Sequence, residues 1–170
     1  MKFHTIHVPY SKGVGFHHNF HNINEIGLQK AYKSEKKLHI EGDILFIGGT
    51  SNKQDWYDNL TKIPFWGDLR KSQRYKDADE LLKQNPQVKK LVGHSLAGSV
   101  SLELEKQKPD RAFEVTTYGA PVVQMSSKKH KRFRHPLDPI SAFDKGAVVL
   151  DTKDFTLDPL KHHSYKGFGN

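Results

Sequence analysis

The stretch KKLVGHSLAGSVSLELEKQ, residues 89–107, constrains the fold more than any other part of the chain. An apolar run, KKLV, leads into Gly93, His94 and Ser95, and the residues that follow have helical spacing. A strand that turns directly into a helix folds its backbone back on itself, so the residues two before and two after the turn must be small. Gly93 and Ala97 meet that requirement. The stretch therefore predicts a strand, a tight turn at Ser95 and a helix.

The rest of the chain alternates between strand-like and helix-like patterns. Helices are expected at 22–35, 72–85 and 96–107, and strands at 2–8, 37–40, 43–49, 87–93 and 112–121. Ser72 is expected to cap the second helix, and Glu41 and Gly42 to form a hairpin turn. This alternation predicts an α/β fold, with a mostly parallel central sheet and helices on both faces. The length of 170 residues predicts a single domain over 1–170.

Two segments have more specific expectations. In the first helix, Ile23, Ile26 and Ala31 have helical spacing, with Asn22 as the cap. Residues 122–134 are basic and turn-like, and the segment GAVVLDTKDFTL predicts a hairpin around DTKD.

Composition excludes several classes of protein. No apolar run approaches the roughly 20 residues that cross a bilayer, and the N-terminus lacks the apolar core of a secretory signal. The cytoplasm is then the default location, with a viral particle as the alternative. Without Cys there is no disulfide framework. The net charge is +8, but Lys outnumbers Arg 22 to 5, and Arg is better suited to reading bases, so nucleic-acid recognition is disfavoured.

Ser95 has two interpretations. It can cap an ordinary helix, which does not explain the small residues around it. It can also be a nucleophile, which requires a base within hydrogen-bond reach. Enzymes with a serine on such a turn carry the partners later in the chain, in the order Ser, acid, His. Ser95, Asp138 and His163 follow that order.

Several separated segments resemble the class three lipase family, the fungal-lipase-like branch of the α/β hydrolases, over about 44–168. GHSLAG resembles the family's Gly-His-Ser-Leu-Gly-Gly turn, TTYGAP its Thr-Phe-Gly-Ser-Pro strand end, and DPIS its Asp-Pro-Val segment. IGGTSNKQDWYDNL resembles the segment in which Gly-Thr or Gly-Ser precedes Trp and Asp-Leu at a fixed distance. The resemblance implies a small α/β-hydrolase domain that needs no cofactor.

The resemblance also implies roles for particular residues. The backbone N–H groups of Thr50 and Leu96 would form the oxyanion hole. Trp56 and Tyr57 would occupy the position of the family's lid and contact the substrate. The sequence departs from the family at three places: Ile47-Gly48 stands for Phe-Arg, Asn59 for Asp and Ala97 for Gly.

The other two members of the predicted triad have competitors. Asp138 is preferred because the family pattern points to it, and the competing acids are Asp144, Asp151, Asp154 and Asp158. His163 is preferred over His162 as the base, because His-Ser-Tyr resembles the tail of small family members. The N-terminal histidines do not predict a metal site, since His4 and His7 would face opposite sides of a strand.

The expected activity is that of a monomeric serine ester hydrolase of the lipase, phospholipase or esterase type. The alternative is a catalytically inactive lipase-like scaffold that binds anionic lipid or an acidic partner. The basic run KKHKRFRH has two interpretations, a solvated loop and a contact with an anionic membrane surface. The residues of that contact would be Lys128, Lys129, Lys131, Arg132 and Arg134.

Overall fold

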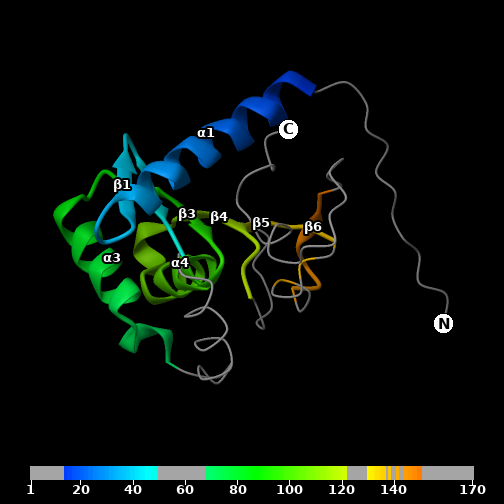
Figure 1. Cartoon of the computed structure of the whole chain (residues 1–170). Helices are drawn as coiled ribbons and strands as arrows, with labels where there is room; N and C mark the ends of the chain where they lie inside the picture. The colour runs from blue at the N-terminus through cyan, green and yellow to red at the C-terminus, as the bar shows by residue number, and fades with distance from the viewer. Residues whose placement is uncertain are drawn as a thin grey trace.

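A mostly parallel sheet organises the chain (Figure 1). The computed structural model describes residues 14–49, 68–121, 130–136, 138, 141 and 144–150, and side chains from residue 19 onward. The helices are α1 (Val14–Lys33), α3 (Gln73–Gln84) and α4 (Leu96–Gln107), with 3-10 turns η1 (Leu69–Lys71) and η2 (Pro109–Arg111). The strands are β1 (Leu38–Glu41), β2 (Ile44–Ile47), β3 (Lys90–His94), β4 (Glu114–Tyr118), β5 (His130–Arg134) and β6 (Val148–Val149).

Within the described residues, the strands lie side by side in chain order, from β1 to β6. β1 and β2 form the predicted antiparallel hairpin, which turns at Gly42 with a φ of 60°. Every later pair, from β2 with β3 to β5 with β6, is parallel. The carboxyl ends of β2, β3, β4 and β5 therefore meet along one edge of the sheet, where open α/β sheets bind their ligands.

Helices cover both faces of the sheet, as the sequence predicts (Figure 1). On one face, Leu45, Ile47 and Leu91 share a buried cluster with side chains of α3 and α4. On the other face, Phe46 and Val92 pack with side chains of α1. Neighbouring residues of one strand thus point to opposite cores, which explains why β2 reads as a continuous apolar run.

The predictions for α3 and α4 are confirmed. Ser72 caps α3, and its side chain accepts a hydrogen bond from the N–H of Tyr75. α4 begins at Leu96 and ends at Gln107, within the predicted bounds. Both helices have strong local signals, a capping residue in one case and a proline after the last turn in the other.

The prediction for α1 is wrong at its start and for two of its three apolar positions, whereas the third, Ala31, is buried. The helix already includes Asn22, which therefore is not its cap. Ile23 and Ile26 are 56% and 47% exposed, and the helix instead buries His21 and Asn24, followed by other side chains at helical spacing. His21 Nδ1 and Asn24 Nδ2 lie 2.8 and 2.9 Å from Tyr118 Oη. Polar anchors hold this half of the helix, and apolar periodicity does not detect them.

The prediction for residues 122–134 is also wrong at its end, because β5 is a strand paired with β4. β5 has the charged sequence HKRFR, which is not typical of a strand, and its Arg132 side chain is buried. Arg132 lies 3.1 Å from the carboxylate of Asp144, and both side chains are 4% exposed. Of the predicted hairpin around DTKD, the structure describes only the strand at Val148 and Val149, which pairs with β5.

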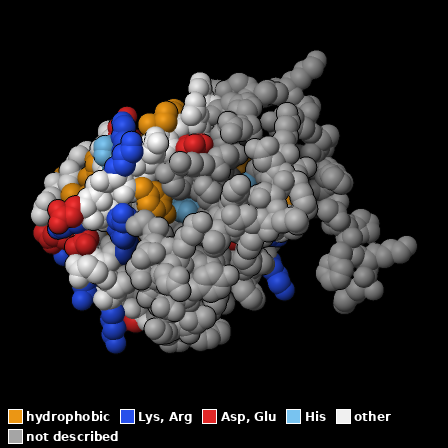
Figure 2. Space-filling view, in the orientation of Figure 1, with side chains coloured by type: hydrophobic (Ala, Val, Ile, Leu, Met, Phe, Trp, Pro, Cys, Tyr) orange, Lys and Arg blue, Asp and Glu red, His pale blue; other side chains and the backbone are white. Residues whose placement is uncertain are grey.

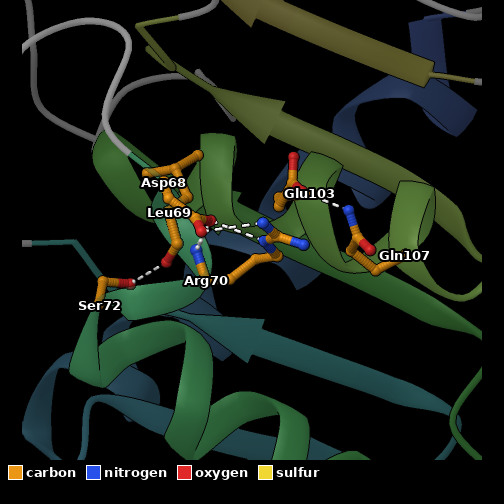
Figure 3. A network of polar contacts seen from close by, with 6 residues as sticks. All are labelled: Asp68, Leu69, Arg70, Ser72, Glu103 and Gln107. Carbon is orange, nitrogen blue, oxygen red and sulfur yellow. Dashed lines mark hydrogen bonds and ion pairs between the residues drawn. The ribbon is translucent and has the colours of Figure 1, made fainter.

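The connection after β2 re-enters the described structure at η1 (Figure 3). The Arg70 guanidinium donates to both carboxylate oxygens of Asp68, at 2.7 and 2.9 Å, and Ser72 Oγ donates to the carbonyl of Leu69. η1 packs beside α4, whose Gln107 donates to Glu103. η1 follows the segment that holds Thr50, Trp56 and Tyr57, which lies outside the described residues.

Among the residues described, no helix combines the length and the apolar character that crossing a membrane requires.

Candidate active site

The turn between β3 and α4 holds Ser95 in an unusual backbone conformation. Its φ is 58° and its ψ is −136°. A positive φ of this kind destabilises a residue that has a side chain by about 1–3 kcal/mol. The Ser95 N–H donates to the carbonyl of Tyr118 at 2.9 Å, and the N–H of Gly98 donates to the carbonyl of Ser95 at 2.8 Å. The Ser95 side chain makes no capping hydrogen bond to α4, so the capping interpretation does not account for it.

Two glycines make this turn sterically feasible. A Cβ on Gly93 would lie 2.5 Å from the carbonyl oxygen of Ala97, so α4 passes directly over the end of β3. A Cβ on Gly98 would lie 2.6 Å from the Cβ of Ala120. Ala97 itself, which departs from the family pattern, is buried among the core side chains of α4. The closest backbone contacts of the turn are therefore at Gly93 and Gly98, where a side chain would not fit. The methyl group of Ala97 is accommodated in the core.

We expect Gly93→Ala to lower the free energy of unfolding by at least about 1–3 kcal/mol, because its Cβ would overlap a backbone carbonyl that cannot move alone. Gly48→Ala is the matched control, since a Cβ there would lie 3.4 Å from the ring of Tyr32, an ordinary contact, and should change stability by less than about 1 kcal/mol. Urea unfolding measures both. Equal stability of the two variants would contradict this account of the turn.

The end of β2 lies against the same turn. The position that a Cβ on Gly49 would take is 2.9 Å from Ser95 Cβ and 2.8 Å from the carbonyl oxygen of His94. The Gly49 N–H donates to Tyr32 Oη at 2.9 Å, and Tyr32 Oη lies 2.6 Å from His94 Nδ1. The predicted oxyanion segment, which continues into Thr50, thus leaves β2 beside Ser95.

The N-terminus of α4 supplies the other predicted oxyanion donor. Leu96 follows Ser95 and is the first residue of α4. The first four N–H groups of an α-helix have no acceptor within the helix, and the helix dipole favours negative charge there. The Leu96 N–H is therefore one of the four N–H groups at the end of α4 that begins beside Ser95.

Asp138 follows the carboxyl end of β5 and is 1% exposed. Ser141 Oγ donates to Asp138 Oδ2 at 2.5 Å, and the Asp138 N–H donates to the carbonyl of His135 at 3.3 Å. A buried carboxylate requires partners of this kind. β5 is separated from β3 by β4 alone, so Asp138 and Ser95 follow strands that end at the same edge of the sheet.

Asp144, a competing acid, has a structural role. It forms the buried ion pair with Arg132, and its carboxylate also accepts the N–H of Gly146. Burial raises the pKa of Asp144, an effect that the charge of Arg132 opposes. This ion pair gives Asp144 a role in joining β5 to the segment before β6. The other competing acids, at 151, 154 and 158, lie outside the described residues.

The ion pair also corrects one residue of the predicted membrane contact. Arg132 is buried and paired, so it does not belong to an exposed basic surface. Lys131 is exposed, with its Nζ 5.0 Å from the ring centre of Phe20, and Arg134 is half-buried. Basic and acidic side chains are interspersed on the face over α3 (Figure 2), where Lys83 pairs with Asp79 at 3.0 Å.

The structure thus brings together Ser95, Leu96 and Gly49, the residue that precedes Thr50. Asp138 is also described, and it follows the carboxyl end of β5. The remaining predicted residues lie outside the described part: Thr50, Trp56, Tyr57, Lys128, Lys129, His162 and His163. Within that part, no group of three or more His, Asp or Glu side chains is arranged to hold a metal ion.

Sequence reasoning missed two side chains beside the predicted residues. Tyr32 lies on a helix outside the recognised segments, and no local signal marks it. Ser141 could have been found, since it stands three residues after Asp138 in DPIS, where a hydroxyl can reach back to the carboxylate.

A groove between α1 and the sheet lies away from Ser95. Its lining includes Phe20 and Asn24 of α1 and the first residues of three strands, Ile44, Lys90 and Glu114. The amino ends of these strands lie at the opposite edge of the sheet from Ser95, so this groove is separate from the candidate site.

The described residues have the small α/β architecture that the sequence predicts: a mostly parallel sheet, helices on both faces and a strand–turn–helix at Ser95. The fold is similar to the crystal structure of Lip2 lipase from Yarrowia lipolytica, with a TM-score of 0.37 and 15% sequence identity. The match covers 61% of this chain and 52% of that lipase, so the chain spans about half the lipase's length. No protein-family model matches the sequence, and no curated protein matches it.

Proposed function

We propose that this chain is a serine ester hydrolase that cleaves lipid acyl esters through an acyl-enzyme. The observation that carries the proposal is the conformation of Ser95, a buried hydroxyl on a strained turn that makes no capping bond. Such a conformation is costly and persists where the surrounding structure enforces it, which occurs most often at functional sites. The strand before Ser95 and the helix after it also support the proposal, because a nucleophile turn has that arrangement.

In the proposed reaction, Ser95 Oγ attacks the ester carbonyl while His163 Nε2 takes the hydroxyl proton. The carbonyl oxygen becomes an oxyanion that the N–H groups of Leu96 and Thr50 stabilise. The carbon–oxygen bond to the alcohol then breaks, His163 returns the proton to that alcohol, and the acyl group stays on Ser95. Water repeats the sequence and releases the carboxylic acid, and no cofactor is required.

Asp138 would hold the imidazole in the tautomer that accepts the serine proton. Its burial and its hydrogen bond from Ser141 support this role, because they fix the carboxylate in one orientation. The ion pair of Asp144 supports the choice of Asp138 over that competitor.

Labelling with a fluorophosphonate probe tests the proposal. The probe phosphonylates an activated serine, so we expect one equivalent of label, which peptide mapping assigns to Ser95. Heat-unfolded protein is the control and should take up no label. A folded protein that neither reacts with the probe nor hydrolyses a short p-nitrophenyl ester would exclude the proposed activity.

The inactive scaffold that binds anionic lipid has weaker support. Arg132 is removed from the basic surface, and several described lysines already have acidic partners, including Lys90 with Asp43 and Lys108 with Asp79. Absence of labelling together with salt-sensitive binding to phosphatidylserine vesicles would favour this alternative.

A further inference from the structure

Tyr32 contacts both the segment after β2 and the turn after β3, which the proposed mechanism requires to lie side by side. It lies near the end of α1, far in sequence from both segments. Its Oη accepts the Gly49 N–H at 2.9 Å and lies 2.6 Å from His94 Nδ1. Gly49 precedes Thr50, the predicted oxyanion donor, and His94 precedes Ser95.

The geometry around Gly49 shows how close these groups are. The position that a Cβ on Gly49 would take lies 3.1 Å from Tyr32 Oη and 2.9 Å from Ser95 Cβ. The Tyr32 ring also passes Gly48, where a Cβ would lie 3.4 Å from the ring. Gly48 and Gly49 thus allow the phenol to lie against the backbone that leaves β2.

The hydrogen bonds of Tyr32 are also directional. The Gly49 N–H donates to Tyr32 Oη, and the same oxygen lies within hydrogen-bond distance of His94 Nδ1. The rings of Tyr32 and His94 meet edge to face, with centres 5.8 Å apart. The orientations of Gly49 and His94 are therefore coupled through one hydroxyl.

We propose that Tyr32 is a positioning residue that holds the oxyanion segment after β2 against the serine turn after β3. This inference rests on the proposed ester hydrolysis for its catalytic consequence. Tyr32 itself does not act on the substrate. In the proposed mechanism the N–H groups of Thr50 and Leu96 must align with the oxyanion, and a displacement of about 1 Å in such a group can cost 100-fold.

Tyr32→Phe tests the proposal, because it keeps the ring against Gly48 and removes only the hydroxyl. We expect kcat for p-nitrophenyl butyrate to fall roughly 10- to 100-fold, with KM changed less than about twofold. The inhibition constant of an alkyl boronic acid, whose tetrahedral adduct needs the oxyanion hole, should rise by a similar factor. Hydrogen exchange at the Gly49 amide should accelerate, since that N–H loses its acceptor.

Asn24→Ala is the matched control. It also removes a buried hydrogen bond of α1, but this bond goes to Tyr118 Oη and not to Gly49 or His94. We expect its melting temperature to fall by about 2 to 4 °C per kcal/mol lost, with kcat, boronate inhibition and Gly49 exchange near those of the unchanged protein. A loose α1 alone would affect both variants equally, whereas a positioning role affects Tyr32→Phe alone.

The outcomes separate this proposal from the proposed function. If the unchanged protein is active and Tyr32→Phe retains its kcat and boronate affinity, the positioning role is wrong and the hydrolase assignment stands. If the unchanged protein is inactive, the hydrolase assignment fails, and Gly49 exchange still decides whether Tyr32 holds the segment. Unchanged exchange in Tyr32→Phe would overturn the positioning role in either case.

Discussion

Replacement of Ser95 by alanine should lower kcat for a short p-nitrophenyl ester by about 10⁶-fold, the effect of removing a serine nucleophile. The loss should leave the fold intact, because the Ser95 side chain caps no helix and its backbone bond to Tyr118 is retained. Steady-state kinetics and circular dichroism measure the two effects. Activity close to that of the unchanged protein would contradict the assignment of Ser95.

Ser95→Gly is the companion variant, and it tests the strain directly. Glycine adopts a φ of 58° without the cost that a side chain incurs. Both variants lack the hydroxyl, so both should be inactive. We expect the glycine variant to be more stable than the alanine variant by about 1 kcal/mol, after the greater entropy of its unfolded chain is included. Urea unfolding of the two folded variants gives the difference.

Asp138→Asn should lower kcat by about 10⁴-fold with little effect on KM, because an amide cannot hold the imidazole in the required tautomer. The substitution preserves volume at a site that is 1% exposed, and the amide oxygen can still accept the Ser141 hydroxyl. The catalytic loss should therefore exceed any loss of stability. Kinetics below the melting temperature of the variant measure it.

The double variant Arg132→Met with Asp144→Leu is the control for this prediction. It removes the other described buried acid together with its partner, so no buried charge is left unpaired. Replacement of a whole buried ion pair by apolar side chains is often neutral or stabilising. We expect a folded protein with kcat within about threefold of the unchanged chain, which is a small effect on the barrier. If this variant loses activity and Asp138→Asn keeps it, the catalytic acid has been assigned to the wrong residue.

The fold was predictable wherever its causes are local in the sequence. Ser72 marks the start of α3, and the run from KKLV through Gly93 and Ala97 specifies the turn into α4. The burial of His21 and Asn24 on α1 was not predictable, because both contact the hydroxyl of Tyr118, which is distant in the sequence. A search for apolar spacing selects Ile23 in their place.

β5 was missed for a similar reason. An inward arginine contradicts the pattern of a strand unless a buried acid neutralises it, and Asp144 comes from a later segment. Candidate site residues show the same division. Motif order was enough to select Ser95 and Asp138 as candidates. Tyr32, in contrast, contacts His94, which lies 62 residues later in the sequence. No short pattern in the sequence encodes such a contact.

The order of the strands bears on how the chain folds. Each strand from β2 to β6 pairs with the strand that precedes it along the chain, so no strand has to be inserted between two that are already paired. A growing chain can therefore extend the sheet one strand at a time, with β3, α4 and β4 as a compact intermediate unit. The strained turn at Ser95 lies inside that unit and forms once β4 provides the carbonyl of Tyr118 that its N–H requires. The cost of the turn is thus offset in part by the pairing of β3 with β4, which places that carbonyl beside Ser95.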